Sequence, residues 1–290
     1  MKRPGTQLLF MLPAIVLFTL FLMIPMVGSF YFSLTNWDGL SPHVDYVGFQ
    51  NYKTLLHDSE VWIALKNTFI FAALVTVLQN VLSLLLALLL DKAGWLVRFL
   101  RVVYLIPAML SALAIGYVWT YFYNPVLGVI NVMLDNIGLG AWAQDWLGDP
   151  KFSMYSVVFT NIWQWTGLSI IIYLAGLQAI PHDLYEAGDI DGARRLQRFR
   201  HITFPLIAPA FTVNILISII GSLKVFDLIY VMTKGGPGTA TESLAVLLYK
   251  KAFNFNEMGY GTAIAIVMFF VILAISVIQL RILRGREIEA

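Results

Sequence analysis

The stretch that decides the fold reads EAGDIDGARRLQRFRHITFP and covers residues 186–205. It carries seven charged side chains and lies between two long apolar runs, 155–178 and 206–232. Charged groups are costly inside a bilayer and stable in water. We therefore predict that this stretch is a polar loop joining two membrane-spanning helices.

The composition of the whole chain agrees with membrane insertion. Of its 290 residues, 59% are hydrophobic and 12% are charged, and the mean hydropathy is +0.77. Soluble domains carry roughly 25% charged residues, so this chain has too few to coat a globule. The absence of cysteine excludes disulfides, thiol catalysis and cysteine-bound metals. A net charge of +2 gives no indication of nucleic-acid binding.

Six apolar runs are long enough to cross a bilayer, which takes about 20 helical residues. They cover 8–34, 67–90, 102–123, 155–178, 206–232 and 260–281. The first run is too long for a cleaved signal peptide, so we expect it to be retained. The predicted fold is all-α, an integral membrane protein with six transmembrane helices. Residues 1–66 would form the tail, first helix and outer loop, residues 67–281 the transmembrane core with the loop 181–205, and residues 282–290 a second tail.

The distribution of Lys and Arg predicts the orientation of the chain. If the N-terminus is inside, the inner segments hold twelve of the nineteen Lys and Arg residues, and the outer segments hold six. Lys224 is the remaining one, and every Arg falls on the inner side. Because positive side chains favour the cytoplasmic side, both termini and the loop 181–205 are expected in the cytoplasm.

The loop has the signals of two short helices set at an angle. Pro181 and Asp183 are typical of a helix start, because proline lacks the N–H donor and an acid interacts favourably with the helix N-terminus. Gly192 permits a bend, and Pro205 is expected to close the second helix. Four small residues leave room for a partner's backbone: Ala187, Gly188, Gly192 and Ala193. The pair fits a groove in a soluble protein; a plain connection between two spans is the alternative.

The order of residues in this loop resembles the EAA loop of bacterial ABC importer permeases. The family pattern is Glu-Ala-Ala, three residues, Gly-Ala, eight residues and Ile-x-Leu-Pro. Here Gly188 replaces the second Ala and Phe204 replaces Leu. Residues 226–237, with Thr241, resemble the carbohydrate subfamily, whose MalF-type members carry a Thr-x-Gly-Gly-Pro turn. Residues 46–52 resemble the segment before the family's second span, so the resemblance covers most of the chain.

The resemblance implies a type I ABC permease fold and the permease subunit of an ATP-driven importer. The implied cargo is a sugar, a di- or oligosaccharide, delivered by an extracytoplasmic sugar-binding protein. The other implied partners are a second, MalG-type permease, an ABC ATPase dimer and membrane lipid. By position, the ATPase would dock on Glu186, Ala187, Gly188, Asp191, Gly192 and Ala193. The chain has no G-x-x-x-x-G-K-[ST] phosphate loop, so a separate subunit hydrolyses ATP; no catalytic residue, cofactor or metal is expected.

Polar and aromatic side chains within the spans are candidates for the sugar path. They are Asn214, Ser218, Ser222, Lys224, Asp227, Trp119, Tyr123, Asn161 and Gln164, with Gln79 and Asn80 as further polar positions. Ionisable groups inside a span usually face the bundle interior. Lys224 and Asp227 are three residues apart, which predicts one helical face and either a neutralised pair on the path or a structural pair near the outer interface.

The remaining candidates also leave two interpretations open. Asn214, Ser218 and Ser222 are spaced by four, so this stripe hydrogen-bonds sugar hydroxyls or joins neighbouring helices. The aromatic group at the outer ends of spans three and four consists of Trp119, Tyr121, Tyr123, Trp163 and Trp165. Its rings either stack on sugar faces or form an interfacial belt.

The loop 124–154 is predicted to lie on the outer side of the membrane. Apolar positions at 128–137 fit a short surface helix, so the loop with Asp145 and Asp149 either receives the binding protein or caps the bundle. An ion-coupled secondary transporter often shows inverted repeats and broken helices, and the sequence reveals neither. A membrane enzyme is disfavoured because the four His residues lie apart in loops. A glycerol phosphate ester or a polyol remains an alternative cargo, although phosphate favours Arg and none lies in the interior of a predicted span.

Overall fold

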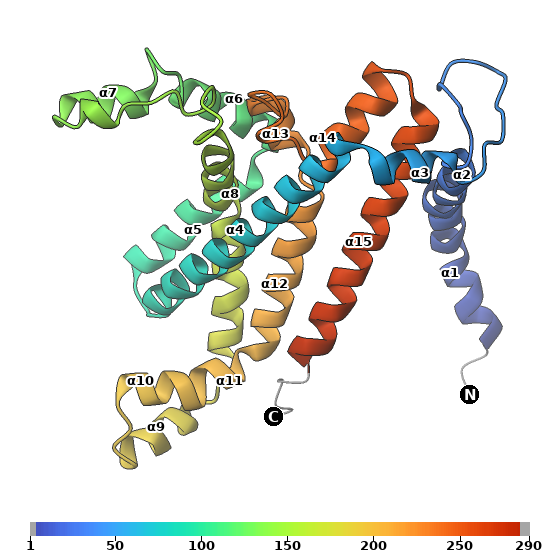
Figure 1. Cartoon of the computed structure of the whole chain (residues 1–290). Helices are drawn as coiled ribbons and strands as arrows, with labels where there is room; N and C mark the ends of the chain where they lie inside the picture. Colours follow the sequence, from blue (N-terminus) through green and yellow to red (C-terminus); the bar gives the residue numbers. More distant parts are fainter. Residues whose placement is uncertain (1–3, 285–290) are drawn as a thin grey trace. The chain divides into compact units, whose positions relative to one another are not determined.

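The computed structural model describes residues 4–284 and separates into two compact units. Unit 1 combines the segment up to Val61 with Leu247–Phe270, and unit 2 combines Trp62–Val246 with the segment from Val271. The described residues form helices and loops, and their one β pairing is an isolated bridge between Thr35 and Tyr46. The prediction of an all-α fold is confirmed (Figure 1).

Length and composition identify four described helices that suffice to cross a membrane, or six spans if each of two bent pairs counts as one. The four are Met11–Phe32, Ser59–Leu90, Ser153–Gln178 and Met258–Leu283. The bent pairs are Trp95–Met109 with Ala112–Phe122, and Arg195–Leu206 with Ala208–Leu223. Six spans are therefore consistent with the structure, but two of them are not straight helices.

Unit 1 begins with a continuous helical rod. It consists of α1 (Pro4–Phe18), the π-helical turn η1 (Thr19–Met23) and α2 (Ile24–Phe32). The residues at both junctions keep helical dihedral angles, so the rod is not interrupted. No residue between Met11 and Phe32 is buried by the chain itself. The apolar surface of this rod is therefore left for lipid or for another chain.

Polar contacts connect the two halves of unit 1, which also contains α3 (Gln50–His57), η4 (Lys250–Asn254) and the start of α15 (Met258–Arg284). The Tyr260 hydroxyl donates to Asp58 Oδ2 at 2.7 Å, and Lys251 Nζ lies 2.9 Å from Glu60 Oε2. Burial disfavours the charged form of Lys251, but the surrounding carboxylates, Glu60 first, outweigh it and raise the pKa of Lys251 above its ordinary value. The N-terminal and C-terminal segments are thus held by charge as well as by packing.

Unit 2 is a bundle of α4 (Ser59–Leu90), α5 (Trp95–Met109), α6 (Ala112–Phe122), α8 (Ser153–Gln178), α12 (Ala208–Leu223) and α13 (Asp227–Met232). Helix α8 contacts α5, α12, α13 and α6. Small residues allow these close approaches. A Cβ atom on Gly167 of α8 would collide with the Tyr104 carbonyl oxygen of α5, and one on Gly176 would lie 2.6 Å from the Ala210 Cβ.

The helix predicted over 102–123 is broken. α5 ends at Met109, α6 begins at Ala112, and the two axes differ by 100°. Pro107 lacks the N–H that would continue the helix hydrogen bonds, and Leu110 is extended. Ser111 then caps α6, because its hydroxyl accepts from the Ala114 N–H at 3.2 Å. A proline followed by an N-cap serine thus interrupts an otherwise apolar run.

The helix predicted over 206–232 is also interrupted, so the expectation drawn from unbroken apolar runs is wrong for both spans. α12 follows the helical segment Arg195–Leu206 after a bend of 68°, and it ends at Leu223. Residues 224–226 are not helical, and α13 starts at Asp227. Ser243 Oγ donates to the free Val225 carbonyl at 2.9 Å, which stabilises the break.

Two connections of unit 2 lie at opposite ends of α8 (Figure 1). At one end is α7 (Val129–Asn136), which confirms the short helix predicted near 128–137. At the other end are α9 (His182–Ile190), α10 (Arg195–Arg198), the π-helical turn η3 (Phe199–Thr203) and α11 (Phe204–Leu206). A bilayer crossed by α8 separates these two connections.

Candidate functional site

A cavity of about 540 Å³ lies next to both helix breaks of unit 2. Ala112, just after the first break, and residues 224–226, which form the second, contribute to its wall. The polar lining consists of Gln79, Asn161, Gln164, Ser169, Asn214, Ser218, Ser222, Lys224 and Asp227. Seven of the nine candidates for the sugar path are in this set, so residues from separate spans converge on one space.

The polar stripe of α12, formed by Asn214, Ser218 and Ser222, both faces the cavity and takes part in hydrogen bonds between helices. Its three members line the cavity, and Asn214 and Ser218 also bond to neighbouring helices. Asn214 Nδ2 donates to the Ser169 carbonyl of α8 at 3.0 Å, and Asn80 Nδ2 of α4 donates to Ser218 Oγ at 2.9 Å. Ser222 Oγ donates to the Ser218 carbonyl at 2.6 Å. The stripe therefore fixes α12 against α4 and α8 while it presents polar atoms to the cavity.

Gln164 offers an unused acceptor beside the cavity. Its Nε2 donates to the Leu110 carbonyl at the first helix break, at 3.4 Å. Its Oε1 is buried and has no hydrogen-bond partner among the described residues. Leaving a buried acceptor unpaired costs about 1–3 kcal/mol. A ligand hydroxyl that donated to Gln164 Oε1 would remove this cost.

Lys224 and Asp227 do not form the pair that their spacing predicts. Because α12 ends at Leu223, Lys224 is its C-cap and Asp227 is the first residue of α13, so no common helix aligns them. Both are exposed and both line the cavity. No salt bridge joins them within the described part of the chain. The cavity therefore contains one positive and one negative group that do not neutralise each other by contact.

The two aromatic candidates lie outside this cavity. Trp119 and Tyr123 belong to the apolar core of unit 2, and the Tyr123 hydroxyl donates to the Ser156 carbonyl at 3.1 Å. The Trp119 ring packs against Trp163, with centroids 5.4 Å apart. Neither ring lines this cavity, so the prediction that these two stack on the cargo is not supported by their position. Trp165 supplies an aromatic ring to the cavity instead.

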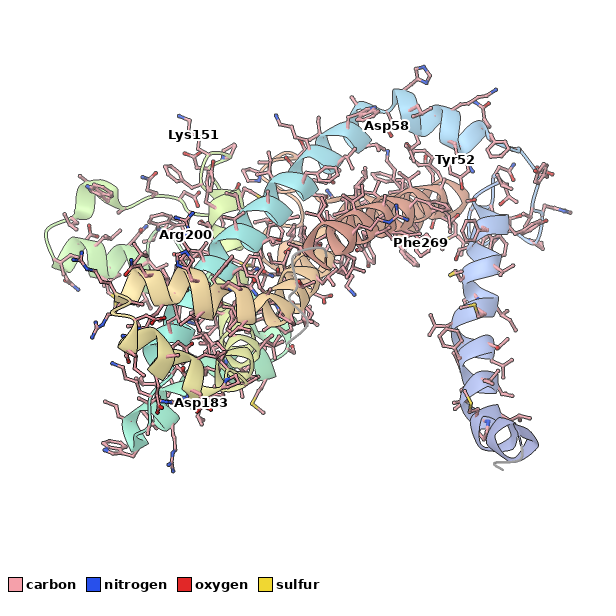
Figure 2. All side chains as sticks on the ribbon, turned by 90° about the horizontal axis from the view of Figure 1, so that it is seen from below. Tyr52, Asp58, Lys151, Asp183, Arg200 and Phe269 are labelled. Carbon is pink, nitrogen blue, oxygen red and sulfur yellow. The ribbon has the colours of Figure 1, made fainter. Side chains whose placement is uncertain are left out.

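The loop 181–205 folds into two helical segments that pack on each other, as predicted. α9 follows Pro181 directly and has Asp183 in its first turn. The second segment runs from Arg195 to Leu206, so Pro205 lies in its last turn. Figure 2 labels Asp183 on the first segment and Arg200 on the second. Asp189 forms an ion pair with Arg198, and the hydroxyls of Tyr185 and Thr203 lie 3.0 Å apart. These contacts make the loop a braced unit.

Two positions of the loop, 188 and 192, favour glycine because of the structure of the chain itself. Gly188 is buried, and a Cβ there would lie 3.0 Å from Ile202 Cδ1, so the space expected for a partner's backbone is filled by the chain itself. Gly192 has φ +72°, a conformation that favours glycine. Its N–H donates to the Asp189 carbonyl and the Ala193 N–H to the Gly188 carbonyl, which is a Schellman end to α9.

The exposed surface of the loop includes two residues that the sequence reasoning missed. Glu186, Ala187 and Asp191 are exposed, as docking residues must be. Ile190 and Leu196 are also exposed, by 87% and 75%. Large apolar side chains within a charged loop are a signal that was available in the sequence. Together these five residues define a mixed polar and apolar surface, which we call the loop surface.

The sequence profile of the family described as binding-protein-dependent transport system inner membrane component matches residues 79–288. The chain belongs to this family. The match covers most of the chain and includes the cavity, the loop surface and both helix breaks. The protein is therefore a multi-pass membrane component of a transport system, a permease, which settles the choice against an ion-coupled transporter or an enzyme.

Individual relatives extend over nearly the whole permease. It is 36% identical to the probable starch degradation products transport system permease of Thermoanaerobacterium thermosulfurigenes, over 97% of this chain and 94% of that one. It is 35% identical to the trehalose/maltose transport system permease of Thermococcus litoralis, over 96% and 94%. A crystal structure of a bacterial ABC transporter that imports the acidic polysaccharide alginate matches with a TM-score of 0.85 and 27% identity, over 98% and 96%. The resemblance to carbohydrate ABC importer permeases is confirmed.

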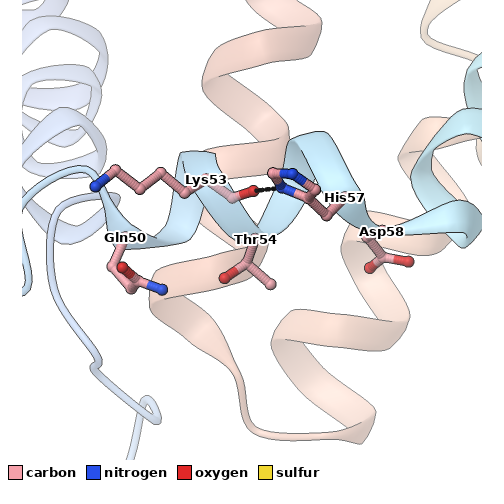
Figure 3. A pocket seen from close by; sticks show the side chains of 5 residues that line it. All are labelled: Gln50, Lys53, Thr54, His57 and Asp58. Carbon is pink, nitrogen blue, oxygen red and sulfur yellow. Dashed lines mark hydrogen bonds between the residues drawn. The ribbon is translucent and has the colours of Figure 1, made fainter.

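Two further recesses of the permease differ from this cavity in construction. One, of about 410 Å³, is built from Tyr123, Asp145 and the turn at Thr233 and Pro237, which belong to distant segments of unit 2. The other, of about 580 Å³, lies on α3 in unit 1 and is lined by Gln50, Lys53, Thr54, His57 and Asp58 (Figure 3). Its side chains come from one helix and the residue after it, so it lacks the convergence seen in the cavity of unit 2.

Proposed function

We propose that this permease is one of two membrane subunits of an ATP-driven sugar importer and that the cavity of unit 2 is its half of the sugar path. The observation that carries the proposal is the convergence of seven predicted path residues beside two helix breaks. Amide and hydroxyl side chains both donate and accept hydrogen bonds, as sugar hydroxyls do. Relatives named for maltose, starch products and alginate support a carbohydrate cargo, a di- or oligosaccharide.

The charges of the cavity support a neutral sugar over a phosphate ester. Phosphate groups are commonly bound by Arg, which donates two parallel hydrogen bonds. The residues that line the cavity include no Arg, and Lys224 is accompanied by the carboxylate of Asp227. An anionic cargo would meet this carboxylate in the same space.

The loop surface supports docking of an ABC ATPase dimer. Glu186 and Asp191 supply charge, and Ile190 and Leu196 supply exposed apolar side chains of the kind that anchor interfaces. Gly188, Gly192 and Ala193 shape the turn that presents them. The surplus of Lys and Arg on this side of the spans supports a cytoplasmic position for the loop and both termini.

The opposite end of α8 supports docking of an extracytoplasmic sugar-binding protein. The loop 124–154 contributes Asp145 and Gly148 to the recess of about 410 Å³, next to Gly236 and Pro237. A crystal structure similar to this chain shows the alginate transporter in complex with a pentasaccharide-bound periplasmic protein. The second permease would complete the sugar path, because one chain lines only part of it.

Exchange of Gln164 tests the assignment of the cavity. In proteoliposomes that contain the permease with its ATPase, partner permease and binding protein, Gln164→Leu should raise the KM for sugar uptake roughly tenfold, because one hydrogen bond to the cargo is lost. Thr76→Val is the matched control, since Thr76 Oγ1 is also buried without a hydrogen-bond partner in the described part of the chain but does not line the cavity.

Two outcomes would contradict the proposal. Equal KM values for Gln164→Leu and Thr76→Val would remove the cavity from the sugar path. Uptake of sugar by vesicles that contain this chain without any ATPase would remove the proposed function altogether.

The apolar part of the loop surface is tested by a double exchange, Ile190→Ser with Leu196→Ser. Burying a large aliphatic side chain is worth about 1.5–3 kcal/mol, so copurification of the ATPase with the permease should fall at least tenfold. The control is Ile137→Ser, an exposed apolar residue at the other end of α8, which should leave copurification unchanged. Retention of the ATPase by the double variant would show that these side chains lie outside the docking surface.

A further inference from the structure

A continuous series of side-chain contacts runs from the loop 181–205 to the cavity within unit 2. It begins at Phe199 in η3, whose ring centroid lies 5.9 Å from that of Phe204. Phe204 meets Phe211 of α12 edge to face at 5.7 Å, and Phe211 lies 6.3 Å from Tyr173 of α8. The aromatic part of the series therefore crosses the bend between the loop and α12.

At Tyr173 the series changes from aromatic contacts to hydrogen bonds. The Tyr173 hydroxyl donates to Asn80 Oδ1 at 2.7 Å. Asn80 Nδ2 in turn donates to Ser218 Oγ at 2.9 Å, and Ser218 lines the cavity. The three residues are only 0%, 4% and 6% exposed, so these bonds are buried.

The hydrogen bonds of Tyr173, Asn80 and Ser218 fix the relative positions of helices more strictly than apolar packing would. Each hydrogen bond joins two different helices, first α8 to α4 and then α4 to α12. Hydrogen bonds are directional, and a buried one is costly to leave unmade. Asn80 Nδ2 also donates to the Thr76 carbonyl of its own helix at 2.7 Å, so its amide cannot rotate freely. The junction therefore fixes the positions of three helices along one another.

We infer that Tyr173, Asn80 and Phe211 are positioning residues that transmit movement of the loop to the cavity. This inference rests on the proposed function. The loop enters α12 through Ile207, which is fully buried in the same apolar cluster as Tyr173. A movement of the loop therefore displaces Phe211 against Tyr173. Ser218 then moves together with Asn80 if the hydrogen bond between them is kept, or separates from Asn80 if this bond is broken. Either result changes where Ser218 and its neighbours meet the sugar.

The decisive experiment uses Tyr173→Phe, which removes one hydroxyl and keeps the ring. In the assembled complex, the measured quantities are basal ATP hydrolysis, its stimulation by sugar-loaded binding protein, and sugar imported per ATP. Tyr173→Phe should leave assembly and basal hydrolysis unchanged and lower the stimulation about fivefold, as expected for one lost buried hydrogen bond. Ser83→Ala is the matched control, because Ser83 Oγ also joins α4 to α8, through the Thr166 carbonyl, outside the series.

A second variant tests the loop end of the series. Phe211→Leu leaves the lining of the cavity intact, so it should lower the stimulation while the KM for sugar stays unchanged. If Tyr173→Phe and Phe211→Leu behave as Ser83→Ala does, the inference is wrong and the proposed function stands. If the unmodified complex shows no sugar-stimulated hydrolysis, the proposed function fails, and this inference fails with it.

Discussion

Gly192 is the residue at which local conformation and proposed function coincide. Its φ of +72° lets the chain leave α9 and start α10, and no heavy atom lies within 4 Å of the position of a Cβ. Within the chain itself, the strain of a substitution there is therefore conformational and not steric. The braced geometry of the two segments depends on this one turn.

Substitution of Gly192 by Val and by Asn separates conformation from side-chain volume. A left-handed conformation costs an ordinary residue about 1–2 kcal/mol, and Asn adopts it more readily than a β-branched residue does. Gly192→Val should therefore reduce sugar-dependent ATP hydrolysis severalfold, and Gly192→Asn should retain most of it. Normal membrane insertion of both variants is the control. Equal activity of the two would mean that the turn does not govern coupling.

Several residues could be assigned from the sequence because their roles depend on near neighbours. Pro181, Asp183 and Gly192 begin and end α9 as their chemistry predicts. The polar stripe of α12 was found by its spacing, which holds as long as the helix continues. The expected pair of Lys224 and Asp227 on one helical face was wrong because α12 ends at Leu223, before either residue. Gly188 was misjudged because Ile202, its neighbour in space, is fourteen residues away.

At the scale of the element, apolar runs located the spans but not their breaks. The break after Met109 has local signals, Pro107 and the N-cap Ser111, which the apolar character of 102–123 concealed. The break at 224–226 contains neither proline nor glycine. It is held by Ser243, which is distant in the sequence, so no local pattern could have predicted it. Since both breaks border the cavity, the features hardest to predict are those that shape the candidate site.

Removal of the Ser243 hydroxyl tests the importance of the second break. Ser243→Ala leaves the Val225 carbonyl without its donor, so residues 224–226 should lose their fixed position beside the cavity. We expect the KM for sugar uptake to rise about fivefold, with docking of the ATPase unchanged. Ser276→Ala, which removes a buried hydroxyl that has no hydrogen-bond partner among the described residues, is the control. An unchanged KM for Ser243→Ala would show that the break is held by other contacts.

At the scale of the whole molecule, composition predicted a membrane protein with six spans, with which the structure is consistent. The resemblance of the loop 181–205 predicted a permease, which family membership confirms. What they left open is the cargo, because that depends on a few side chains brought together by folding. The cavity collects amides, hydroxyls and the two opposite charges of Lys224 and Asp227. This chemistry favours a cargo without a net charge.

Competition by a charged analogue tests this preference. In the assembled importer, a neutral oligosaccharide should compete with labelled sugar much better than the same oligosaccharide carrying a phosphate. Asp227→Asn should improve competition by the phosphate about fivefold, because it removes a repulsion of roughly 1 kcal/mol between like charges at several ångströms. A phosphate that competes best with the unmodified permease would point to the ester as cargo.

The rod formed by α1, η1 and α2 buries none of its side chains between Met11 and Phe32 in the rest of the chain. Its insertion into the membrane during synthesis therefore depends on its own hydrophobicity, because the later helices have not yet been synthesised. Exchange of one aliphatic side chain for another along this rod should leave the stability of the bundle in unit 2 unchanged. A single charge near its middle, in contrast, would oppose insertion of the rod, however well the remaining helices pack.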